Sequence, residues 1–294
     1  MKRFRLLFMV LFATKLFAWG DVGHEVVAKI AWTQLNTRTQ EKMTKLLQLT
    51  APFYEENKSF VTASRWADLI KNGMPAYNNW HYINQPYIMS PLQQTPDTDK
   101  VNVIYALCQV TKTLKKSPRE FDKAWMLPML IHLVGDVHQP LHGATQYTKD
   151  KPEGDQGGNL FFIIVNGKTA NLHLYWDLGL GLLGNVHAPY HPVTTESPMT
   201  EGLAKEWAAE FPQTYFKEQI QDINFDHWAK ADLDLAKAVV YQTPEYAAPS
   251  EAYIASGQKL IKEKVVLAGY RLAYLMQKIF DSNDKLDLGC SWAN

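Results

Sequence analysis

Apolar positions recur along most of the chain at the three- and four-residue spacing of amphipathic helices. In residues 22–35, VGHEVVAKIAWTQL, this spacing predicts a helix, and residues 37–48 open with a threonine suited to capping another. The same periodicity predicts further helices over 60–71, 101–115, 121–138, 200–218, 223–241 and 250–281. The sequence therefore predicts a mainly α fold.

One segment departs from the helical pattern. Residues 159–174, NLFFIIVNGKTANLHL, contain two apolar runs around Asn166 and Gly167, a dipeptide suited to a tight hairpin turn. No linker or internal repeat divides the chain, and its length is within reach of a single hydrophobic core. We predict one mainly α domain over residues 19–294 with a small β-hairpin.

The first 18 residues have the layout of a secretory signal peptide. Three basic residues lie within the first five positions, residues 6–13 are apolar, and Ala18 stands at the expected cleavage site. The apolar run is too short for a permanent membrane anchor, although the irregular region before Ala18 leaves a retained N-terminal segment open. We expect cleavage after Ala18 and export of an unanchored monomer to a periplasm or the medium.

Cleavage changes the charge balance of the chain. It would remove four basic residues and no acidic one, which leaves 26 basic against 30 acidic residues. A mildly acidic chain does not offer the broad basic surface on which many proteins hold nucleic acid. Any affinity for phosphate must therefore come from a local site.

The chain has only two cysteines, Cys108 and Cys290. Export would place them in an oxidising compartment, where they could form a disulfide. Two cysteines are few for a disulfide-built fold, so the sequence leaves both the paired and the free state open.

The densest group of polar residues with metal-binding chemistry is the segment HLVGDVHQPLHG, residues 132–143. His132 and Asp136 are four residues apart, so a helix would place both on one face. His142 follows a proline-containing turn that can bring it back toward them. Imidazole nitrogens and carboxylate oxygens in such an arrangement suit zinc.

Other candidates repeat the same chemistry. His173 and Asp177 in HLYWD again lie four residues apart, while Asp68 in SRWAD and His81 in NWHY lie upstream. One His-Asp pair alone is more often a hydrogen-bonded surface pair than a metal ligand pair. The co-occurrence of two such pairs with further histidines among aromatic residues favours a metal site.

These motifs, in this order, resemble those of the S1/P1-type nucleases, a family of secreted zinc-dependent phosphodiesterases related to the bacterial zinc phospholipases C. The shared motifs run from Trp19 to Asp177, with a weaker similarity in AGYRLAYL, and they read WG, GH, WAD, WHY, HxxGDxHQPLH, GGN and HxxWD. The resemblance implies a single-domain, α-helical fold of the phospholipase C/P1 nuclease type.

The resemblance also implies three zinc ions held by nine residues. It assigns to the first ion His24 and Trp19, the latter through its α-amino nitrogen and carbonyl oxygen. It assigns to the second ion Asp68, His81 and His132, with Asp136 as a bridge between these two ions. The implied ligands of the third ion are His142, His173 and Asp177. A free α-amino group has a pKa near 7.7 to 8.0 and can bind a metal, which an internal amide cannot. Cleavage before Trp19 would thus complete the site. Three zinc ions and three carboxylates give a local charge of about +3, which would attract a phosphodiester.

The implied activity is hydrolysis of single-stranded DNA and RNA to 5′-nucleotides, and the resemblance also allows 3′-nucleotidase activity. Asp68 and Lys71 would act in catalysis, whereas Tyr82, Asn84 and Asn159 would contact the substrate. Tyr82 could stack on an unpaired base. Lys71 stands where the family typically has arginine and supplies a point charge instead of a planar fork. Asn84 stands where an acidic group is typical, and Asn159 fits a turn residue nearly as well.

Two other functions remain open at this point. A zinc phospholipase C acting on lipid head groups would share the metal site, but those enzymes carry a glutamate where this chain has Asp177, and a longer gap than the one between Trp19 and His24. A non-catalytic, exported zinc-binding protein would need the ligands but no substrate pocket. The aromatic residues Trp66, Trp80 and Trp176 near the ligands favour a shaped pocket over a metal store.

Overall fold

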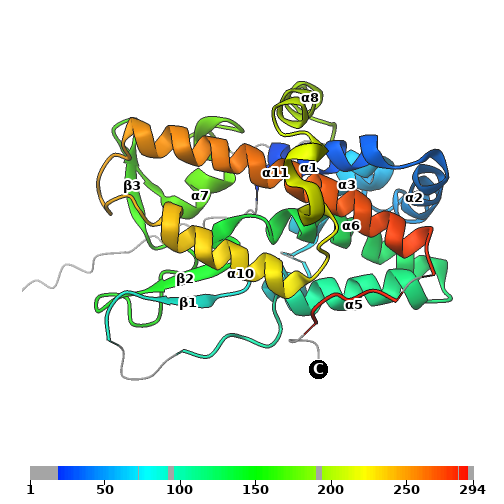
Figure 1. Cartoon of the computed structure of the whole chain (residues 1–294), viewed down its shortest axis with the longest axis horizontal. Helices are drawn as coiled ribbons and strands as arrows, with labels where there is room; N and C mark the ends of the chain where they lie inside the picture. Colours follow the sequence, from blue (N-terminus) through cyan, green and yellow to red (C-terminus); the bar gives the residue numbers. More distant parts are fainter. Residues whose placement is uncertain (1–18, 72, 92–95, 190–193, 284, 291–294) are drawn as a thin grey trace, which may run out of the picture.

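Helices make up most of the protein, and the two sheets are small (Figure 1). The computed structural model describes residues 19–71, 73–91, 96–189, 194–283 and 285–290, so the predicted signal peptide lies outside the described residues. The longer helices are α1 Asp21–Gln34, α2 Thr37–Thr50, α5 Val103–Lys116, α6 Glu120–Asp136, α8 Thr200–Glu210, α10 Phe225–Leu235 and α11 Glu251–Phe280. The mainly α prediction is confirmed.

Shorter elements connect these helices. They are the α-helices α3 Phe60–Ala63, α4 Trp66–Ile70, α7 Leu172–Asp177 and α9 Gln213–Phe216, the 3₁₀ helices η1 Glu55–Lys58, η2 Pro75–His81, η3 Pro140–His142, η4 Gly179–Gly181 and η5 Lys217–Ile220, and the π-helix η6 Ala236–Val240. The strands are β1 Gln85–Ile88, β2 Ala144–Tyr147, β3 Phe162–Val165 and β4 Lys168–Asn171.

The core lies between the long helices. In Figure 1 the long helix α11 crosses one side of the molecule, and it packs on α1 and α6. Helix α6 also packs on α2 and α5, so that its C-terminal half is enclosed and every residue from Leu127 to Asp136 is buried. The predicted ligands His132 and Asp136 are thereby placed in the interior. Among the described residues, no helix combines the length and the apolar character needed to cross a bilayer.

The helix predicted over 60–71 is wrong as a single element. It divides into α3 and α4, because the amides of Ser64 and Arg65 bond three residues back, to Val61 and Thr62. The α-helical hydrogen bonds to the residue four positions earlier resume with the bond from the amide of Leu69 to the carbonyl of Arg65. The carbonyl of Ser64 is therefore available for a bond outside the helix.

The helix predicted over 200–218 also ends early, at Glu210. Pro212 follows, and the residue before a proline is disfavoured in the helical conformation; Phe211 has φ −123° and ψ 74°. The helix predicted over 223–241 is confirmed as α10 followed by η6, which together cover 225–240.

The predicted hairpin is present but shorter than 159–174. Strands β3 and β4 pair antiparallel around Asn166 and Gly167, with Phe162 opposite Asn171. From Leu172 onward the chain is the helix α7, because the Asn171 side chain accepts a hydrogen bond from the amide of Leu174 and caps it. His173 therefore lies on a helix and not on a strand.

A second, parallel pair of strands was not predicted. Strand β1 pairs with β2 in the register Gln85 to Ala144. The sequence QPYI is short and contains a proline, so neither its length nor its pattern marks a strand. The pairing brings the segment after His81 beside the segment after His142.

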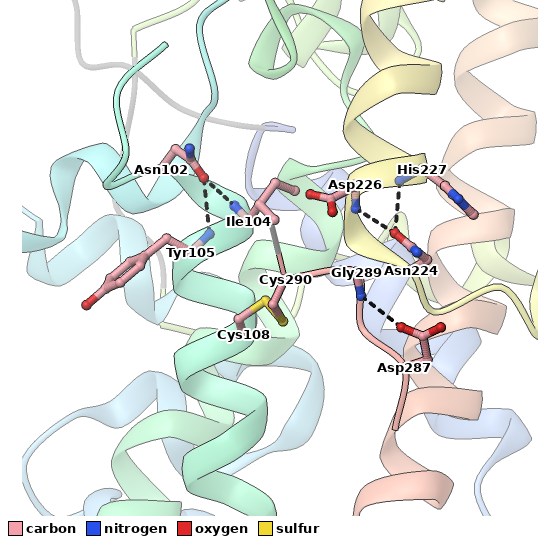
Figure 2. The surroundings of a disulfide bond; sticks show 10 residues. All are labelled: Asn102, Ile104, Tyr105, Cys108, Asn224, Asp226, His227, Asp287, Gly289 and Cys290. Carbon is pink, nitrogen blue, oxygen red and sulfur yellow. Dashed lines mark hydrogen bonds between the residues drawn. A yellow bond between two sulfur atoms is a disulfide. The ribbon is translucent and has the colours of Figure 1, made fainter. Parts of the chain in front are cut away.

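Cys108 and Cys290 form a disulfide with Cα atoms 6.0 Å apart. Figure 2 shows that it joins α5 to the segment that follows α11. The same segment is held to the start of α10 by a hydrogen bond from the amide of Phe225 to the carbonyl of Leu288. The disulfide thus fixes the C-terminal segment across α5 and α10.

Candidate metal centre

The eight predicted ligand side chains converge in the interior although they come from six elements. His24 comes from α1, Asp68 from α4, His81 from the end of η2, His132 and Asp136 from α6, His142 from η3, and His173 and Asp177 from α7. None of the eight is more than 6% exposed. Such a concentration of buried polar groups requires strong internal partners or a bound ion.

Five of these residues, His24, Asp68, His81, His132 and Asp136, form what we call the paired cluster. Asp136 lies at its centre, with Oδ2 3.0 Å from Nδ1 of His81 and 3.2 Å from Nε2 of His132. Its other oxygen, Oδ1, lies 3.4 Å from Nε2 of His24. Oδ1 of Asp68 is 3.8 Å from the same nitrogens of His81 and His132.

The other three residues, His142, His173 and Asp177, form what we call the His142 group. The two imidazole rings have centroids 4.9 Å apart, and Nε2 of His173 lies 3.4 Å from Oδ2 of Asp177. The side chain of Gln139 donates a hydrogen bond of 2.5 Å to Oδ1 of Asp177. The second oxygen of Asp177 therefore faces the two histidines.

Backbone carbonyls orient three of the histidine rings. In each ring Nδ1 donates a hydrogen bond of 2.6 Å to a backbone carbonyl. The acceptor is Ser64 for His132, His81 for His142 and Gly157 for His173. With the proton on Nδ1, the lone pair of Nε2 is directed into the site, as in most histidine metal ligands. The break between α3 and α4 supplies the first of these carbonyls.

Two glycines make room for the ligands. A side chain at Gly135 of α6 would place its Cβ 2.7 Å from Nδ1 of His24, so the close approach of α1 to α6 requires glycine there. Gly157 has φ +64°, and a Cβ would lie 2.6 Å from the carbonyl oxygen of Leu141. The glycine pair that precedes Asn159 thus lets the chain turn tightly enough to hold His173.

Trp19 lies next to both groups. Its side chain is fully buried, its Cδ1 lies 3.7 Å from the position of a Cβ on Gly135, and the amide of Gly20 donates to the carbonyl of Asp177 at 2.9 Å. In the uncleaved chain the nitrogen of Trp19 belongs to a peptide bond with Ala18. Only cleavage at that bond would give Trp19 an amine.

The arrangement fits a metal. Three triads could each hold an ion, because the ligand atoms within each triad lie within 4.8 Å of one another. Two of them share His132: His24 with Asp68 and His132, and His81 with His132 and Asp136. The third, His142 with His173 and Asp177, is separate. Four of the atoms that face these groups have no hydrogen-bond partner: Nε2 of His24, Oδ1 of Asp136, Nε2 of His142 and Oδ2 of Asp177. Buried acceptors without partners are costly, and cations bound among nitrogen and oxygen donors would satisfy them.

Charge is distributed unevenly over the unliganded cluster. Burial, with the nearby His132, lowers the pKa of His24 to about 4. Burial also lowers the pKa of His132, but the carboxylates of Asp136 and Asp68 outweigh it and raise that pKa to about 9. Burial, with the charges of Asp68 and Asp136, raises the pKa of Asp177 well above its usual value. The protein-only site thus retains protons that a bound cation would displace.

The two predicted catalytic residues are adjacent. Nζ of Lys71 donates a hydrogen bond of 2.6 Å to Oδ1 of Asp68. Burial raises the pKa of Asp68, but the charges of Lys71, His132 and His81 together lower it to about 2, so the carboxylate is ionised at neutral pH.

Each of the predicted substrate residues makes a hydrogen bond to another polar group of the protein. The Tyr82 hydroxyl donates to Oδ1 of Asn79 at 2.9 Å, and Oδ1 of Asn84 accepts from the Thr145 hydroxyl at 2.7 Å. All three predicted substrate residues are partly exposed. The side-chain amide of Asn159 donates to the backbone carbonyl of Gln156 at 2.8 Å, which fits its interpretation as a turn residue.

Sequence reasoning assigned no role to several residues that position the ligands. Gln139 lies inside HxxGDxHQPLH, yet nothing in the spacing shows that its side chain reaches Asp177, 38 residues away. The carbonyls of Ser64, His81 and Gly157 leave no sequence signal at all. The paired glycines of GGN were the one available indication of a close approach.

Comparison with known proteins agrees with the motifs. The family model described as S1/P1 Nuclease matches residues 19–281. The protein named Nuclease S1 from Aspergillus oryzae is 25% identical over 87% of this chain and 90% of its own length. Endonuclease 2 and Endonuclease 4 of Arabidopsis thaliana are 26% and 24% identical, over 91% and 96% of this chain and 92% and 95% of their own lengths. The chain belongs to the S1/P1 nuclease family.

Proposed function

We propose that the mature chain is an exported phosphodiesterase with three zinc ions, which hydrolyses single-stranded DNA and RNA to 5′-nucleotides and removes 3′-phosphates from nucleotides. Membership of the nuclease family supports hydrolysis of nucleic acid. The number of ions, the identity of the metal, the strand preference and the 3′-nucleotidase activity are our proposals.

The observation that carries this proposal is the set of buried ligand atoms without hydrogen-bond partners. They belong to two adjacent groups, and both contain histidine nitrogens and carboxylate oxygens. The paired cluster has Asp136 between three histidines, as expected for a carboxylate that bridges two ions. The His142 group offers three ligands, so an ion held there would have room for a substrate oxygen.

When bound, the zinc ions would supply positive charge for the phosphodiester and Lewis-acid activation of a water molecule. The protein's own residues would position that water and the phosphate. Asp68 is ionised, so its carboxylate would be able to accept a hydrogen bond from the water. Lys71, hydrogen-bonded to Asp68, would add a positive charge beside a non-bridging phosphate oxygen.

Tyr82 and Asn84 would bind the base. The bond to Asn79 restrains the ring of Tyr82, and a restrained aromatic ring loses little entropy when a base stacks on it. The side-chain oxygen of Asn84 accepts a hydrogen bond from the Thr145 hydroxyl. We therefore expect the side-chain amide hydrogens of Asn84 to donate to a base edge. Stacking requires an unpaired base, which favours single strands over duplexes.

Export and N-terminal processing are part of the same proposal. The position of Trp19 against both metal-binding groups supports a role for its amine after cleavage. A chain that keeps residues 1–18 would lack that ligand and should bind its first zinc more weakly.

The test compares Asp136→Asn with Asp281→Asn. Asp136 contacts three histidines of the cluster, whereas Asp281 lies at the end of α11 and accepts hydrogen bonds from Asn36 and Thr39. We expect Asp136→Asn to lose the zinc of the paired cluster and nearly all release of 5′-nucleotides from single-stranded DNA. Asp281→Asn should retain both.

Phosphatidylcholine vesicles are the second substrate in this experiment. Wild-type zinc content and turnover in Asp136→Asn would contradict the proposed site. Hydrolysis of phosphatidylcholine by the zinc-loaded wild type, without hydrolysis of DNA or RNA, would replace the nuclease proposal with a phospholipase.

A further inference from the structure

The turn between the paired cluster and the His142 group depends on one histidine that belongs to neither. After Asp136, the amide of His138 bonds the carbonyl of Gly135 at 3.1 Å, and the amide of His142 bonds that of Gln139 at 2.8 Å. This turn therefore sets both the position of His142 and that of Gln139, which holds Asp177.

His138 lies inside this turn and is fully buried. Its Nδ1 donates to the carbonyl of Val134 at 2.8 Å, at the end of α6. The other nitrogen, Nε2, therefore carries the lone pair, and it accepts a hydrogen bond of 2.9 Å from Nη1 of Arg271 on α11. Both ring nitrogens are thus occupied by protein partners, which leaves none for a metal.

Arg271 is itself held in several directions. Its side chain is 7% exposed; Nε donates to the carbonyl of Gln219 at 3.0 Å, and Nη2 lies 3.8 Å from Oδ2 of Asp222. The guanidinium lies over the ring of Trp228, 5.0 Å from the centroid, and that ring also packs on His138 at 4.8 Å. The donor that reaches His138 is therefore fixed by contacts with α10 and the segment before it.

We propose that Arg271 and His138 are a positioning pair, through which α10 and α11 fix the turn that carries His142 and Gln139 and so set the zinc affinity of the His142 group. The inference rests on the zinc site of the proposed function. Neither residue touches the ligand atoms, and the effect passes along the backbone from residue 138 to residue 142.

Two amide substitutions at one position separate the two nitrogens of the ring. The amide of glutamine lies near the position of Nε2, so His138→Gln can still accept from Arg271. The amide of asparagine lies near Nδ1, so His138→Asn can still donate to Val134 but does not reach Arg271. Both variants lose the imidazole ring, so their packing defects should be similar to each other.

The readout is zinc occupancy of the His142 group, measured by anomalous X-ray scattering from crystals equilibrated at buffered zinc concentrations. We expect His138→Asn to weaken zinc binding at this group by about 10- to 100-fold, as is usual when support of a metal ligand is lost, and His138→Gln to remain within a few-fold of wild type. Arg271→Met should resemble His138→Asn. Tyr270→Phe, a change at the neighbouring buried residue of α11, should leave the occupancy unchanged.

Equal zinc affinity in the asparagine and glutamine variants, whether high or low, would overturn the proposal. A measurement on the metal-free wild type covers the case in which the variants do not fold. Nitrogen-15 NMR of the His138 ring should show the proton on Nδ1 and none on Nε2, and a proton on Nε2 would overturn the pair directly. A protein that binds zinc normally but leaves nucleic acid intact would refute the proposed function without affecting this inference.

Discussion

Substitution of Gly135 by alanine tests whether the close approach of α1 to α6 is needed for the metal centre. The added methyl would lie 2.7 Å from Nδ1 and 3.0 Å from Cε1 of His24, where ordinary contacts begin at 3.4 Å. The ring would have to move by about 0.7 Å to relieve the contact. It cannot move freely, because it stacks on His132 with centroids 3.9 Å apart and an interplanar angle of 14°.

Two opposing effects determine the stability of this variant. Alanine is a better helix former than glycine by about 1 kcal/mol, whereas overpacking of a core costs about 1–3 kcal/mol. We expect a net loss of up to about 2 kcal/mol in the free energy of unfolding. Displacement of His24 should also weaken the first zinc by about 10- to 100-fold, the usual effect of a disturbed ligand.

Gly202 in α8 provides the matched control. A Cβ there meets nothing within 4 Å, so Gly202→Ala should only gain the helix preference of about 0.5–1 kcal/mol. The assays are urea unfolding of the metal-free proteins and competition of each protein with a zinc chelator. If Gly135→Ala bound zinc as wild type does and gained stability as Gly202→Ala does, the argument from His24 would be refuted.

Two further predictions concern pH and the substrate. Burial lowers the pKa of His132, but Asp136 and Asp68 outweigh it and raise that pKa from 6.5 to about 9. In the protein stripped of metal by a chelator, the stabilisation from protonated His132 is therefore fully present below pH 6.5 and is lost as the pH rises to 9. Unfolding of chelated protein should become easier by about 3 kcal/mol over this range, whereas an unchanged free energy of unfolding would show that His132 is not protonated there. Tyr82→Leu should lower kcat/KM on single-stranded DNA by about 5- to 150-fold through lost stacking, whereas Tyr82→Phe keeps the ring; equal effects of the two changes would mean that Tyr82 does not stack on a base.

The sequence predicted the long helices well because their apolar periodicity extends over several turns. Prediction was weaker where a single hydrogen bond or residue determines the structure. The division of 60–71 depends on bonds of Ser64 and Arg65 that carry no sequence pattern, and α7 begins because the Asn171 side chain caps it. The strand Gln85–Ile88 exists only through its pairing with a distant segment.

The grouping of the predicted ligand side chains depended on a different kind of signal. The spacing of His132 and Asp136 predicts that both lie on one helix face, and in α6 they do. His173 and Asp177 repeat the spacing, but residue 173 was predicted in the hairpin and lies instead in α7. That these pairs approach residues from α1, α4 and η2 required the family motifs, because sequence distance says nothing about such contacts. Their support by Gln139 and by backbone carbonyls became visible only in three dimensions.

The most direct test of the account is the zinc dependence of hydrolysis by the mature chain beginning at Trp19. The protein would be stripped with a chelator, titrated with zinc, and assayed at each step for release of 5′-nucleotides from single-stranded DNA and RNA. We expect no activity without metal and full activity restored at three zinc ions per chain. Undiminished hydrolysis by the metal-free protein, or none by protein with three bound zinc ions, would contradict it.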